Sequence, residues 1–319
     1  MSAHPTPEPD IPPTGNIAKA LWSRLDGNVR GAVMMSLGAF LLVVMSTLVK
    51  ALGQRLDSFQ ILFVRALFGF LVVAPLLMRN GLQAIRTERA GLHLVRGGIG
   101  ALGNFCFFYA LTHMVLADAM AIQFSRPLFT IVLAFLLLGE VVGWRRATIT
   151  VIGFSGILLI TRPFTEGFEP VALIAALGAL LGTGVVISIK KLARTEKTMV
   201  IMFYYAMWTT IFSAIPAALV WQQPGWHDLG LLCLVGILGI VGQTAVTHGI
   251  SLGDATFVVP FDYLRVVFAV LFGILLFAEI PTLWSFSGAA IIIGSNLYLL
   301  RRGTKVAAGS GPRAPPNSL

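Results

Sequence analysis

Ten long apolar segments, separated by short polar gaps, fill the sequence from residue 31 to residue 300. A transmembrane helix needs about 20 predominantly apolar residues to cross the hydrocarbon core of a bilayer. The alternation of apolar and polar residues that marks membrane β-barrels is not visible. The pattern predicts an all-α membrane protein of ten transmembrane helices, at roughly 31–50, 59–78, 95–113, 117–138, 146–161, 170–189, 198–220, 229–250, 254–278 and 282–300.

Composition excludes a soluble domain. Only 12% of the residues are charged and 56% are hydrophobic, with a mean hydropathy of +0.85, whereas about a quarter of a typical soluble domain is charged. The net charge of +9 does not indicate nucleic-acid binding, because the basic residues form no patch and instead occupy the gaps between apolar segments. We expect no nucleic-acid partner.

The basic residues also predict the orientation of the chain. Of the 23 Lys and Arg residues, 17 fall in gaps on the side of the two termini, and three (Lys50, Arg55 and Arg162) fall on the other side. The remaining three lie within apolar segments. Because Lys and Arg concentrate in cytoplasmic loops, we expect both termini in the cytoplasm and a multi-pass protein of the inner (plasma) membrane.

The second half of the sequence repeats the first. Arg126 precedes Glu140 by 14 residues, and Arg265 precedes Glu279 by the same 14; both glutamates close an apolar segment. Each half contains five predicted helices, an odd number, so the second half must enter the membrane in the opposite orientation. Inverted repeats of this kind are frequent in secondary transporters, where they place a site near the middle of the membrane.

The repeat predicts the organisation of the chain. A first five-helix repeat covers residues 31–161 and a second covers 170–300. The Pro-rich N-tail, 1–30, is expected to be disordered apart from an interfacial amphipathic helix over 17–29. The C-tail, 301–319, is also expected to be disordered.

The segment SRPLFTIVLAFLLLGE, together with the two helices that end in GE and AE, resembles the EamA family of the drug/metabolite transporter superfamily. The resemblance covers about residues 31–300. It implies a ten-helix transporter whose fourth and ninth helices help to line a central cavity. One difference stands out: Val266 occupies the place that Pro127 holds in the first repeat, and the second repeat has Pro260 instead. We therefore expect the ninth helix to kink at a different position.

Ionisable residues inside apolar segments are candidates for function, because they are costly in a membrane. Arg126 and Arg265 could each bind a carboxylate or phosphate of a substrate, since the guanidinium group forms paired hydrogen bonds with such anions. A structural ion pair remains open for Arg265, because Asp262 lies three residues before it on the same helix face. Gln123 holds the equivalent place before Arg126. Arg65 is interpreted as structural, reaching toward the membrane surface.

Other polar residues extend the predicted site. Seven polar or aromatic residues lie within apolar segments and could line an amphipathic pocket: Asn104, Tyr109, Ser125, Tyr204, Tyr205, Gln243 and Tyr263. Asn104, Tyr109, Gln243 and Tyr263 form the predicted substrate-binding set with Arg126, Arg265, Gln123 and Asp262.

A second group of residues is predicted to act in gating or coupling. His113 and His248 close the matching tetrapeptides ALTH and AVTH, and histidine titrates near neutral pH. A plain interfacial hydrogen bond remains the alternative for both. Glu140 and Glu279 stand at helix ends, where gating and structural roles both stay open.

Two further patterns have structural interpretations. The sequence GGIGALG at 97–103 contains a GxGxxG motif, but no strand precedes it, so we interpret its glycines, like those of 236–242, as helix-packing residues. Asp118 and Asp254 begin the fourth and ninth helices, where a carboxylate caps free backbone N–H groups.

These observations predict a secondary transporter for a small polar organic metabolite. The family resemblance implies substrates such as amino acids or vitamins, riboflavin among them. Two alternatives stay open: an intramembrane lipid or head-group modifying enzyme, and a non-transporting membrane assembly partner. Because the sequence has no Walker A, HExxH, GxSxG or CxxC motif, we expect no enzyme activity, cofactor or metal. The expected partners are the small-molecule substrate and membrane lipids, and a homodimer stays open.

Overall fold

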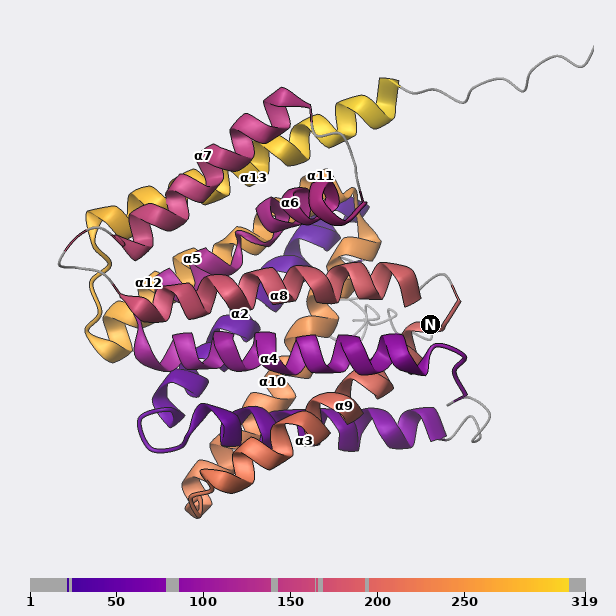
Figure 1. The fold of residues 1–319 in the computed structure, drawn as a ribbon, viewed down its shortest axis with the longest axis vertical. Coiled ribbons are helices and arrows are strands. Elements are labelled where there is room, and N and C mark those ends of the chain that lie inside the picture. Colours follow the sequence, from indigo (N-terminus) through magenta and orange to yellow (C-terminus); the bar gives the residue numbers. More distant parts are fainter. Residues whose placement is uncertain are drawn as a thin grey trace, which may run out of the picture.

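The structure is a computed structural model that describes residues 22, 25–78, 86–138, 143–163, 165, 169–192 and 195–309. Every regular element of this part of the chain is a helix (Figure 1). The helices are α2 (Gly27–Leu52), α3 (Ser58–Met78), α4 (Ala90–His113), α5 (Leu116–Gln123), α6 (Arg126–Leu138), α7 (Trp144–Thr161), α8 (Pro170–Leu192), α9 (Thr198–Leu219), α10 (Trp226–Leu252), α11 (Ala255–Val258), the 3-10 helix η2 (Val259–Tyr263), α12 (Leu264–Phe277) and α13 (Leu283–Gly309).

These helices coincide with the ten predicted segments. The fourth segment is formed by α5 and α6, and the ninth by α11, η2 and α12. In the described residues, nine helical stretches are long and apolar enough to cross a membrane, and Ala147–Thr161 of α7 is a shorter apolar helix. The all-helical, multi-pass membrane architecture is therefore confirmed. One difference in bounds concerns α4, which begins at Ala90 and not at residue 95.

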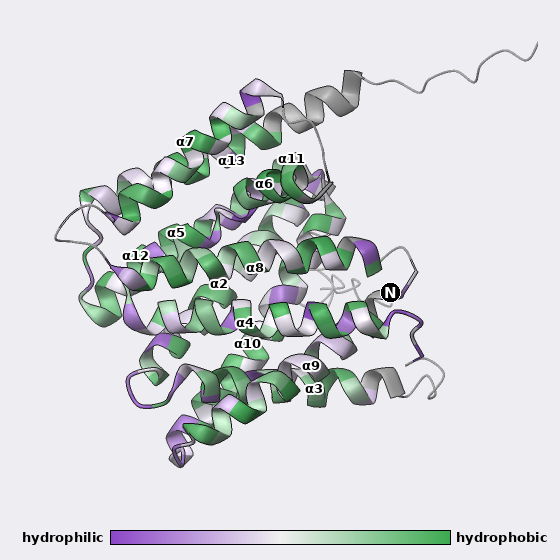
Figure 2. Cartoon of the chain, in the orientation of Figure 1, coloured by the Kyte–Doolittle hydropathy of each residue, from purple (hydrophilic) through white to green (hydrophobic). Residues whose placement is uncertain are grey.

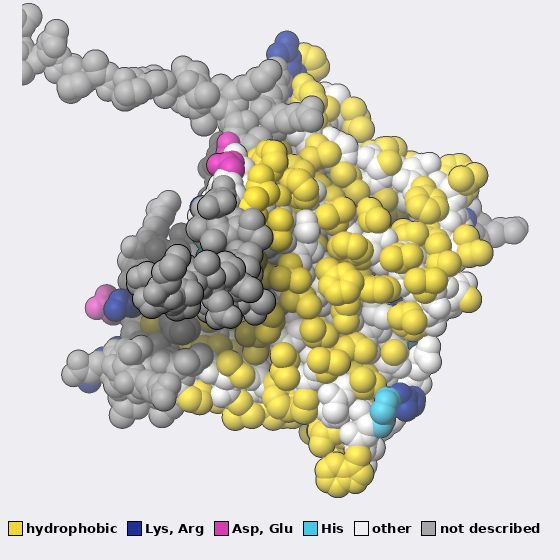
Figure 3. Space-filling model, turned by 180° about the vertical axis from the view of Figure 1, so that it is seen from behind, with side chains coloured by type: hydrophobic (Ala, Val, Ile, Leu, Met, Phe, Trp, Pro, Cys, Tyr) yellow, Lys and Arg dark blue, Asp and Glu magenta, His cyan; other side chains and the backbone are white. Residues whose placement is uncertain are grey.

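The outer surface of the bundle is apolar. Large aliphatic side chains are widely exposed, for example Ile215 at 71%, Val151 at 69% and Leu275 at 66%. Figure 2 shows hydrophobic residues along the spanning helices, and Figure 3 shows them spread over one broad face of the molecule. Soluble monomers rarely expose apolar patches beyond a few hundred Å². These faces are suited to contact with lipid chains.

The two halves of the chain are packed against one another. Helix α2 packs on α10, α3 on α9, α4 on α8, and α7 on α13, so each pair joins one helix from each half. In Figure 1, α7 and α13 run side by side at the top of the view, with α8 and α4 below them. A polar group in the centre of this arrangement is therefore contacted from both halves.

Glycines bring the paired helices close together. A Cβ on Gly38 of α2 would lie 2.8 Å from the backbone nitrogen of Val246 in α10. In the GxGxxG segment, a Cβ on Gly100 would lie 2.8 Å from the Tyr205 ring, and one on Gly103 would lie 3.2 Å from Leu181. The structure confirms the interpretation of these glycines as packing residues, because it leaves no room for a nucleotide there.

The fourth and ninth spans are both broken. Helix α5 ends at Gln123 and α6 begins at Arg126, with a turn between them. The break in the ninth span is the 3-10 helix η2, which has Pro260 in its first turn. This segment ends at Tyr263, two residues before Arg265, and the turn in the fourth span ends directly before Arg126, so a kink at a different position is not confirmed. Broken spans of this kind are typical of transporter substrate sites.

The first span starts earlier than predicted. Helix α2 begins at Gly27, and the carboxylate of Asp26 accepts a hydrogen bond from the Asn28 amide at 3.3 Å. Residues 27–30 therefore belong to the first span and not to the N-tail, and residues 17–21 of the expected interfacial helix lie outside the described residues. At the other end, α13 continues to Gly309, beyond the predicted limit at residue 300.

The contact between α7 and α13 gives a test of the packing. A Cβ on Gly288 would lie 2.5 Å from the carbonyl oxygen of Gly156, and neither backbone can give way without separating the helices. We expect Gly288→Val to lower the free energy of unfolding by about 1–3 kcal/mol, the usual cost of overpacking. Gly294→Val in the same helix is the matched control, because a Cβ there meets nothing within 4 Å. Equal unfolding midpoints for the two variants in detergent would contradict this packing.

Candidate functional site

Arg126 is the first residue of α6, immediately after the break in the fourth span. Its Nε donates to Oε1 of Gln123 at 3.0 Å, and its Nη2 donates to the same oxygen. A Cβ on Gly182, near the middle of α8, would lie 2.8 Å from Nε. Arg126 lies inside a membrane span but keeps accessible surface, and no carboxylate of the described residues forms an ion pair with it.

Arg265 is paired with a carboxylate, unlike Arg126. Its Nη2 lies 2.6 Å from Oδ1 of Asp262, and each side chain is 22% exposed. Asp262 and Arg265 both lie close enough to Arg126 for their charges to act on it. The structure therefore brings together four of the predicted substrate-binding residues, and it contains the Asp262–Arg265 pair that the spacing predicts.

The two helix breaks contact each other. The ring of Phe124, in the break of the fourth span, lies 4.8 Å from the ring of Tyr263, in the break of the ninth. Asn296 of α13 donates from Nδ2 to the Phe124 carbonyl at 2.6 Å. Tyr263 is thus part of the same central region as Arg126, as the prediction required.

Asn104 leads to Tyr205, a predicted pocket candidate, and through it to Arg96, which the sequence prediction did not include. Its Nδ2 donates to the Tyr205 hydroxyl at 2.6 Å. The guanidinium carbon of Arg96 lies 4.4 Å from the centre of the Tyr205 ring, and Nη1 of Arg96 donates to the Ile201 carbonyl at 3.1 Å. The count of basic residues places Arg96 among the 17 gap residues, although the predicted segment 95–113 contains it. The count is wrong at this position, because α4 begins at Ala90, and Arg96 lies inside the span and is only 3% exposed.

Arg65 does not reach toward the membrane surface. A Cβ on Gly239 would lie 3.0 Å from its Nε, and Gly239 stands thirteen residues from either end of α10. Its guanidinium carbon lies 5.5 Å from the centre of the Phe108 ring. The interpretation of Arg65 as a residue that extends to the membrane surface is wrong, because the small Gly239 makes room for it in the middle of the bundle.

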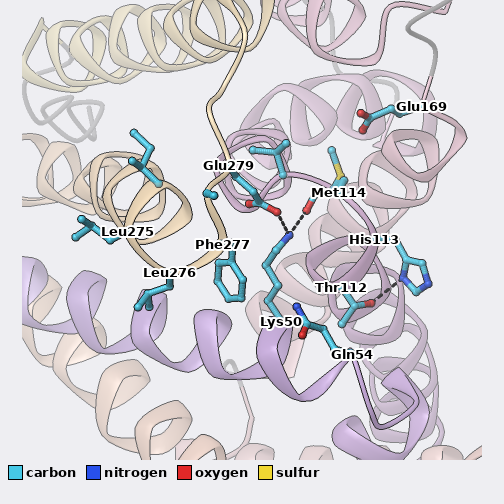
Figure 4. A pocket seen from close by; sticks show the side chains of 13 residues that line it. Lys50, Gln54, Thr112, His113, Met114, Glu169, Leu275, Leu276, Phe277 and Glu279 are labelled. Atoms are coloured by element: carbon cyan, nitrogen blue, oxygen red, sulfur yellow. Dashed lines mark hydrogen bonds and ion pairs between the residues drawn. The ribbon is translucent and has the colours of Figure 1, made fainter.

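A second polar centre lies where α2 ends. Lys50 Nζ is 2.5 Å from Oε1 of Glu279 and donates to the Met114 carbonyl at 2.5 Å (Figure 4). Oε2 of Glu279 accepts from the Leu116 amide at 3.0 Å. The Lys50 and Glu279 side chains are only 8% and 20% exposed. We call these groups of Lys50, Met114, Leu116 and Glu279 the Lys50 network.

The chain is bent so that Glu279 can join this network. Ala278 adopts a left-handed conformation with φ 53° at the end of α12, and the Glu279 amide bonds back to the Gly273 carbonyl at 3.0 Å. Glu279 thereby caps the N-terminus of α5. Asp118 does not cap this helix, contrary to prediction. The N-cap residue, Val115, makes no side-chain hydrogen bond to the helix, and the Asp118 carboxylate accepts a hydrogen bond from the Ser285 hydroxyl of α13 at 2.9 Å.

A pocket of about 750 Å³ opens beside the Lys50 network, and Gln54, His113 and Glu169 also line it. In Figure 4 the His113 ring lies at one side of the pocket, with Lys50 and Glu279 opposite. His113 stacks on Tyr109 with ring centres 4.0 Å apart, and its Nδ1 lies 2.7 Å from the Thr112 hydroxyl. His113 and Tyr109 thus belong to this end of the bundle and not to the central cluster.

Two predicted residues, Gln243 and His248, are not brought into either centre. Gln243 and His248 are exposed on α10, and the Nδ1 of His248 lies 3.5 Å from the Ser251 hydroxyl. Glu140 lies outside the described residues.

A buried polar contact near the start of α4 was not predicted from the sequence. His93 Nε2 lies 2.8 Å from Oε2 of Glu196, with both side chains buried, and the Thr87 hydroxyl donates to the other Glu196 oxygen. This pair ties α4 to the connection between α8 and α9. Among the residues that the structure describes, no group of three or more His, Cys, Asp or Glu side chains is placed to hold a metal ion.

Comparison with protein families gives two matches along the chain. The EamA-like transporter family matches residues 29–162 and again residues 170–301. A solved crystal structure with 21% sequence identity has the same fold: the TM-score is 0.58, and the match covers 85% of this chain and 98% of the other.

Several curated proteins are similar over most of their length. An S-adenosylmethionine uptake transporter of Rickettsia felis is 32% identical in a match that covers 84% of this chain and 92% of the transporter. A riboflavin transporter of Brucella anthropi is 32% identical in a match that covers 77% of this chain and 89% of that transporter. A pseudopaline exporter of Pseudomonas aeruginosa is 31% identical over 85% and 96%.

The Lys50 network predicts a measurable loss of stability. Glu279→Ala leaves the buried Lys50 ammonium without its counter-ion and the Leu116 amide without its acceptor, so we expect unfolding to become easier by about 3 kcal/mol. Glu279→Gln keeps an acceptor and should lose less. Asp228→Asn is the control, because its partner Arg55 is 56% exposed and exposed pairs contribute little. If thermal unfolding ranks Asp228→Asn with Glu279→Ala, the Lys50 network is not a stabilising centre.

Proposed function

Because this chain belongs to the EamA-like transporter family, we propose that it is a secondary transporter that moves a small polar organic metabolite across the inner membrane by alternating access. The observation that carries this proposal is the polar cluster of Gln123, Arg126, Asp262 and Arg265 at the two helix breaks. Ionisable groups inside a membrane bundle mark substrate or ion pathways, and broken helices form transporter binding sites.

We infer that the two halves form an inverted repeat, which suits this mechanism. The family matches the chain twice, and each match contains five of the ten spans. An odd number of spans reverses the orientation of the second half. In such a repeat α2 corresponds to α8, and α4 corresponds to α10. The contact of α2 with α10 is then equivalent to the contact of α8 with α4, and these two helix pairs make the most extensive contacts in the bundle. The distribution of Lys and Arg supports cytoplasmic termini.

The substrate we propose carries a carboxylate or phosphate. The similar transporters are named for S-adenosylmethionine, riboflavin and pseudopaline, so the family alone does not decide the substrate. In the described site, Arg126 has only the neutral Gln123 as a partner, which leaves a guanidinium charge available to an anionic group. Asn104 and Tyr263 border the same region, and Tyr109 and Gln243 stay weaker candidates without a contact to it.

The Lys50 network acts as a gate in this proposal. It joins the end of α2 to the segment after α12, and therefore joins the two halves. With cytoplasmic termini, this end of the bundle faces outward. The outward-open state would require Lys50 and Glu279 to separate.

The family relationship supports transport over the alternative of an intramembrane enzyme. Lipids are suited to cover the exposed apolar faces, and a homodimer would have to use part of the same surface.

The substrate site is tested by ligand-induced stabilisation. A ligand that binds only the folded protein raises its melting temperature, by about 2.7 kcal/mol of stability at a hundredfold excess over Kd. We expect an anionic metabolite to stabilise the purified protein, Arg126→Ala to abolish the effect, and Arg126→Lys to weaken it. Arg145→Ala, on the exposed start of α7, is the control. A ligand that stabilises Arg126→Ala as well as the parent protein would refute the site.

The gate is tested by access from outside. Met114 is buried beneath Lys50, so we expect a cysteine placed there, in a background without Cys106 and Cys233, to react slowly with an impermeant thiol reagent. Glu279→Gln should increase the rate, by about tenfold for each 1.4 kcal/mol by which the closed state is weakened. Asp228→Asn, at the same end, should leave the rate unchanged. An unchanged rate in Glu279→Gln would show that the ion pair does not hold this end closed.

A further inference from the structure

Three arginines in the interior of the bundle lack a carboxylate partner among the described residues: Arg65, Arg96 and Arg126. Charged side chains at this depth are strongly unfavourable unless they are paired. The carboxylate of Asp262 is already bound by Arg265. The excess of positive charge therefore needs an explanation that one anionic group at Arg126 does not supply.

Arg96 is the most deeply buried of the three. It is 3% exposed, and its Nε has no hydrogen-bond partner. Among the described residues, its Nη1 donates to the Ile201 carbonyl. Glu196 is the acidic residue tied to α4 on this side, but His93 and Thr87 bind its two oxygens, and it forms no ion pair with Arg96. The Nε donor of Arg96 is consequently left without an acceptor among the described residues.

Arg65 approaches the same region from α3. Its Nε is also buried without a partner, and its neighbours are Gly239, Met45 and the ring of Phe108. None of these groups can accept a strong hydrogen bond. The Arg65 guanidinium group lies beside Gly239, at the midpoint of α10. At this depth it cannot reach water at the membrane surface.

Tyr205 of α9 lies among the three arginines. Its ring is under Arg96 and against Gly100, which stands near the middle of α4. Asn104, which binds the Tyr205 hydroxyl, stands one helical turn before Phe108, whose ring Arg65 contacts. A Cβ on the adjacent Gly103 would lie 3.6 Å from the backbone nitrogen of Gly182, and Gly182 is the residue against which Arg126 packs. The hydroxyl oxygen accepts from Asn104, so the hydroxyl hydrogen remains free to donate. Two helices of the first half, α3 and α4, and α9 of the second thus direct hydrogen-bond donors toward one place.

We propose that Arg65, Arg96 and Tyr205 form a second anion-binding position, next to the one at Arg126, and that the substrate is an organic dianion with two carboxylate groups. This inference rests on the proposed transport function and narrows its substrate class. One carboxylate is held at Arg126, beside Gln123. The other carboxylate accepts charge-assisted hydrogen bonds from the guanidinium groups of Arg65 and Arg96 and a hydrogen bond from the Tyr205 hydroxyl.

The test compares ligands with one and two carboxylates of equal chain length. The purified protein is placed in phosphatidylcholine nanodiscs, and affinities are measured by calorimetry for the dicarboxylates from succinate to suberate and for the matching monocarboxylates. We expect the best dicarboxylate to bind at least about tenfold more tightly than its monocarboxylate. Arg96→Lys and Tyr205→Phe should remove this advantage while leaving monocarboxylate affinity unchanged. Arg126→Lys should weaken both ligands, and Arg55→Gln, on the exposed surface, should weaken neither.

Each other outcome overturns the inference in a distinguishable way. If monocarboxylates and dicarboxylates bind with equal affinity and both depend on Arg126, the substrate site stands and the second position is absent. If Arg96→Lys, Tyr205→Phe and Arg65→Lys all keep the dicarboxylate advantage, the second carboxylate binds elsewhere. If no carboxylate binds, the anionic substrate class fails with it. If only the addition of phosphatidylglycerol stabilises the protein, and Arg96→Lys removes that effect, the position binds a lipid phosphate and not a substrate.

Discussion

The hydrocarbon core of a membrane supplies no hydrogen-bond partners, and this constraint accounts for most of the structure. Backbone groups must be satisfied within the chain, so each span is helical. Burial of apolar surface does not drive helices together in lipid, and close packing takes its place. The pairs α2 with α10 and α7 with α13 therefore meet at glycines, where a single added Cβ would collide with backbone atoms of the partner helix.

The same constraint applies at the break in the fourth span, where the released backbone groups need hydrogen-bond partners from the protein. A break releases carbonyl groups that the next helical turn would have bound. The Ser125 hydroxyl donates to the Ile122 carbonyl at 2.6 Å, Asn296 to the Phe124 carbonyl at 2.6 Å, and Thr183 to the Arg126 carbonyl at 3.1 Å. Two of these donors come from α13 and α8 of the second half. The backbone that presents Arg126 is thus held open by the opposite half of the molecule.

The sequence predicted what depends on periodicity and local spacing. Apolar runs placed the ten spans, the matched 14-residue spacing located Arg126 and Arg265, and a three-residue spacing indicated the Asp262–Arg265 pair. Partners distant in sequence were not accessible in this way. Lys50 and Glu279 are 229 positions apart in the chain, and the cap of α5 comes from Glu279 because the nearer Asp118 is drawn to Ser285. The depth of Arg96 in its helix was not predicted, because the polar start of α4 hid the first five residues of that helix. The position of the Arg65 side chain was not predicted, because the room for it depends on Gly239 in α10.

Two short helices connect the Lys50 network to the central cluster. All eight residues of α5 are buried; its first amide is bound by Glu279, and its last residue, Gln123, holds Arg126. Helix α12 packs against α5, carries Arg265 near its start, and ends immediately before Ala278 and Glu279. A packed helix transmits displacement along its axis with little internal deformation. A ligand that displaces Arg126 and Arg265 therefore acts on two helices, α5 of the first half and α12 of the second. The ends of α5 and α12 that lie farthest from these arginines are joined through Glu279.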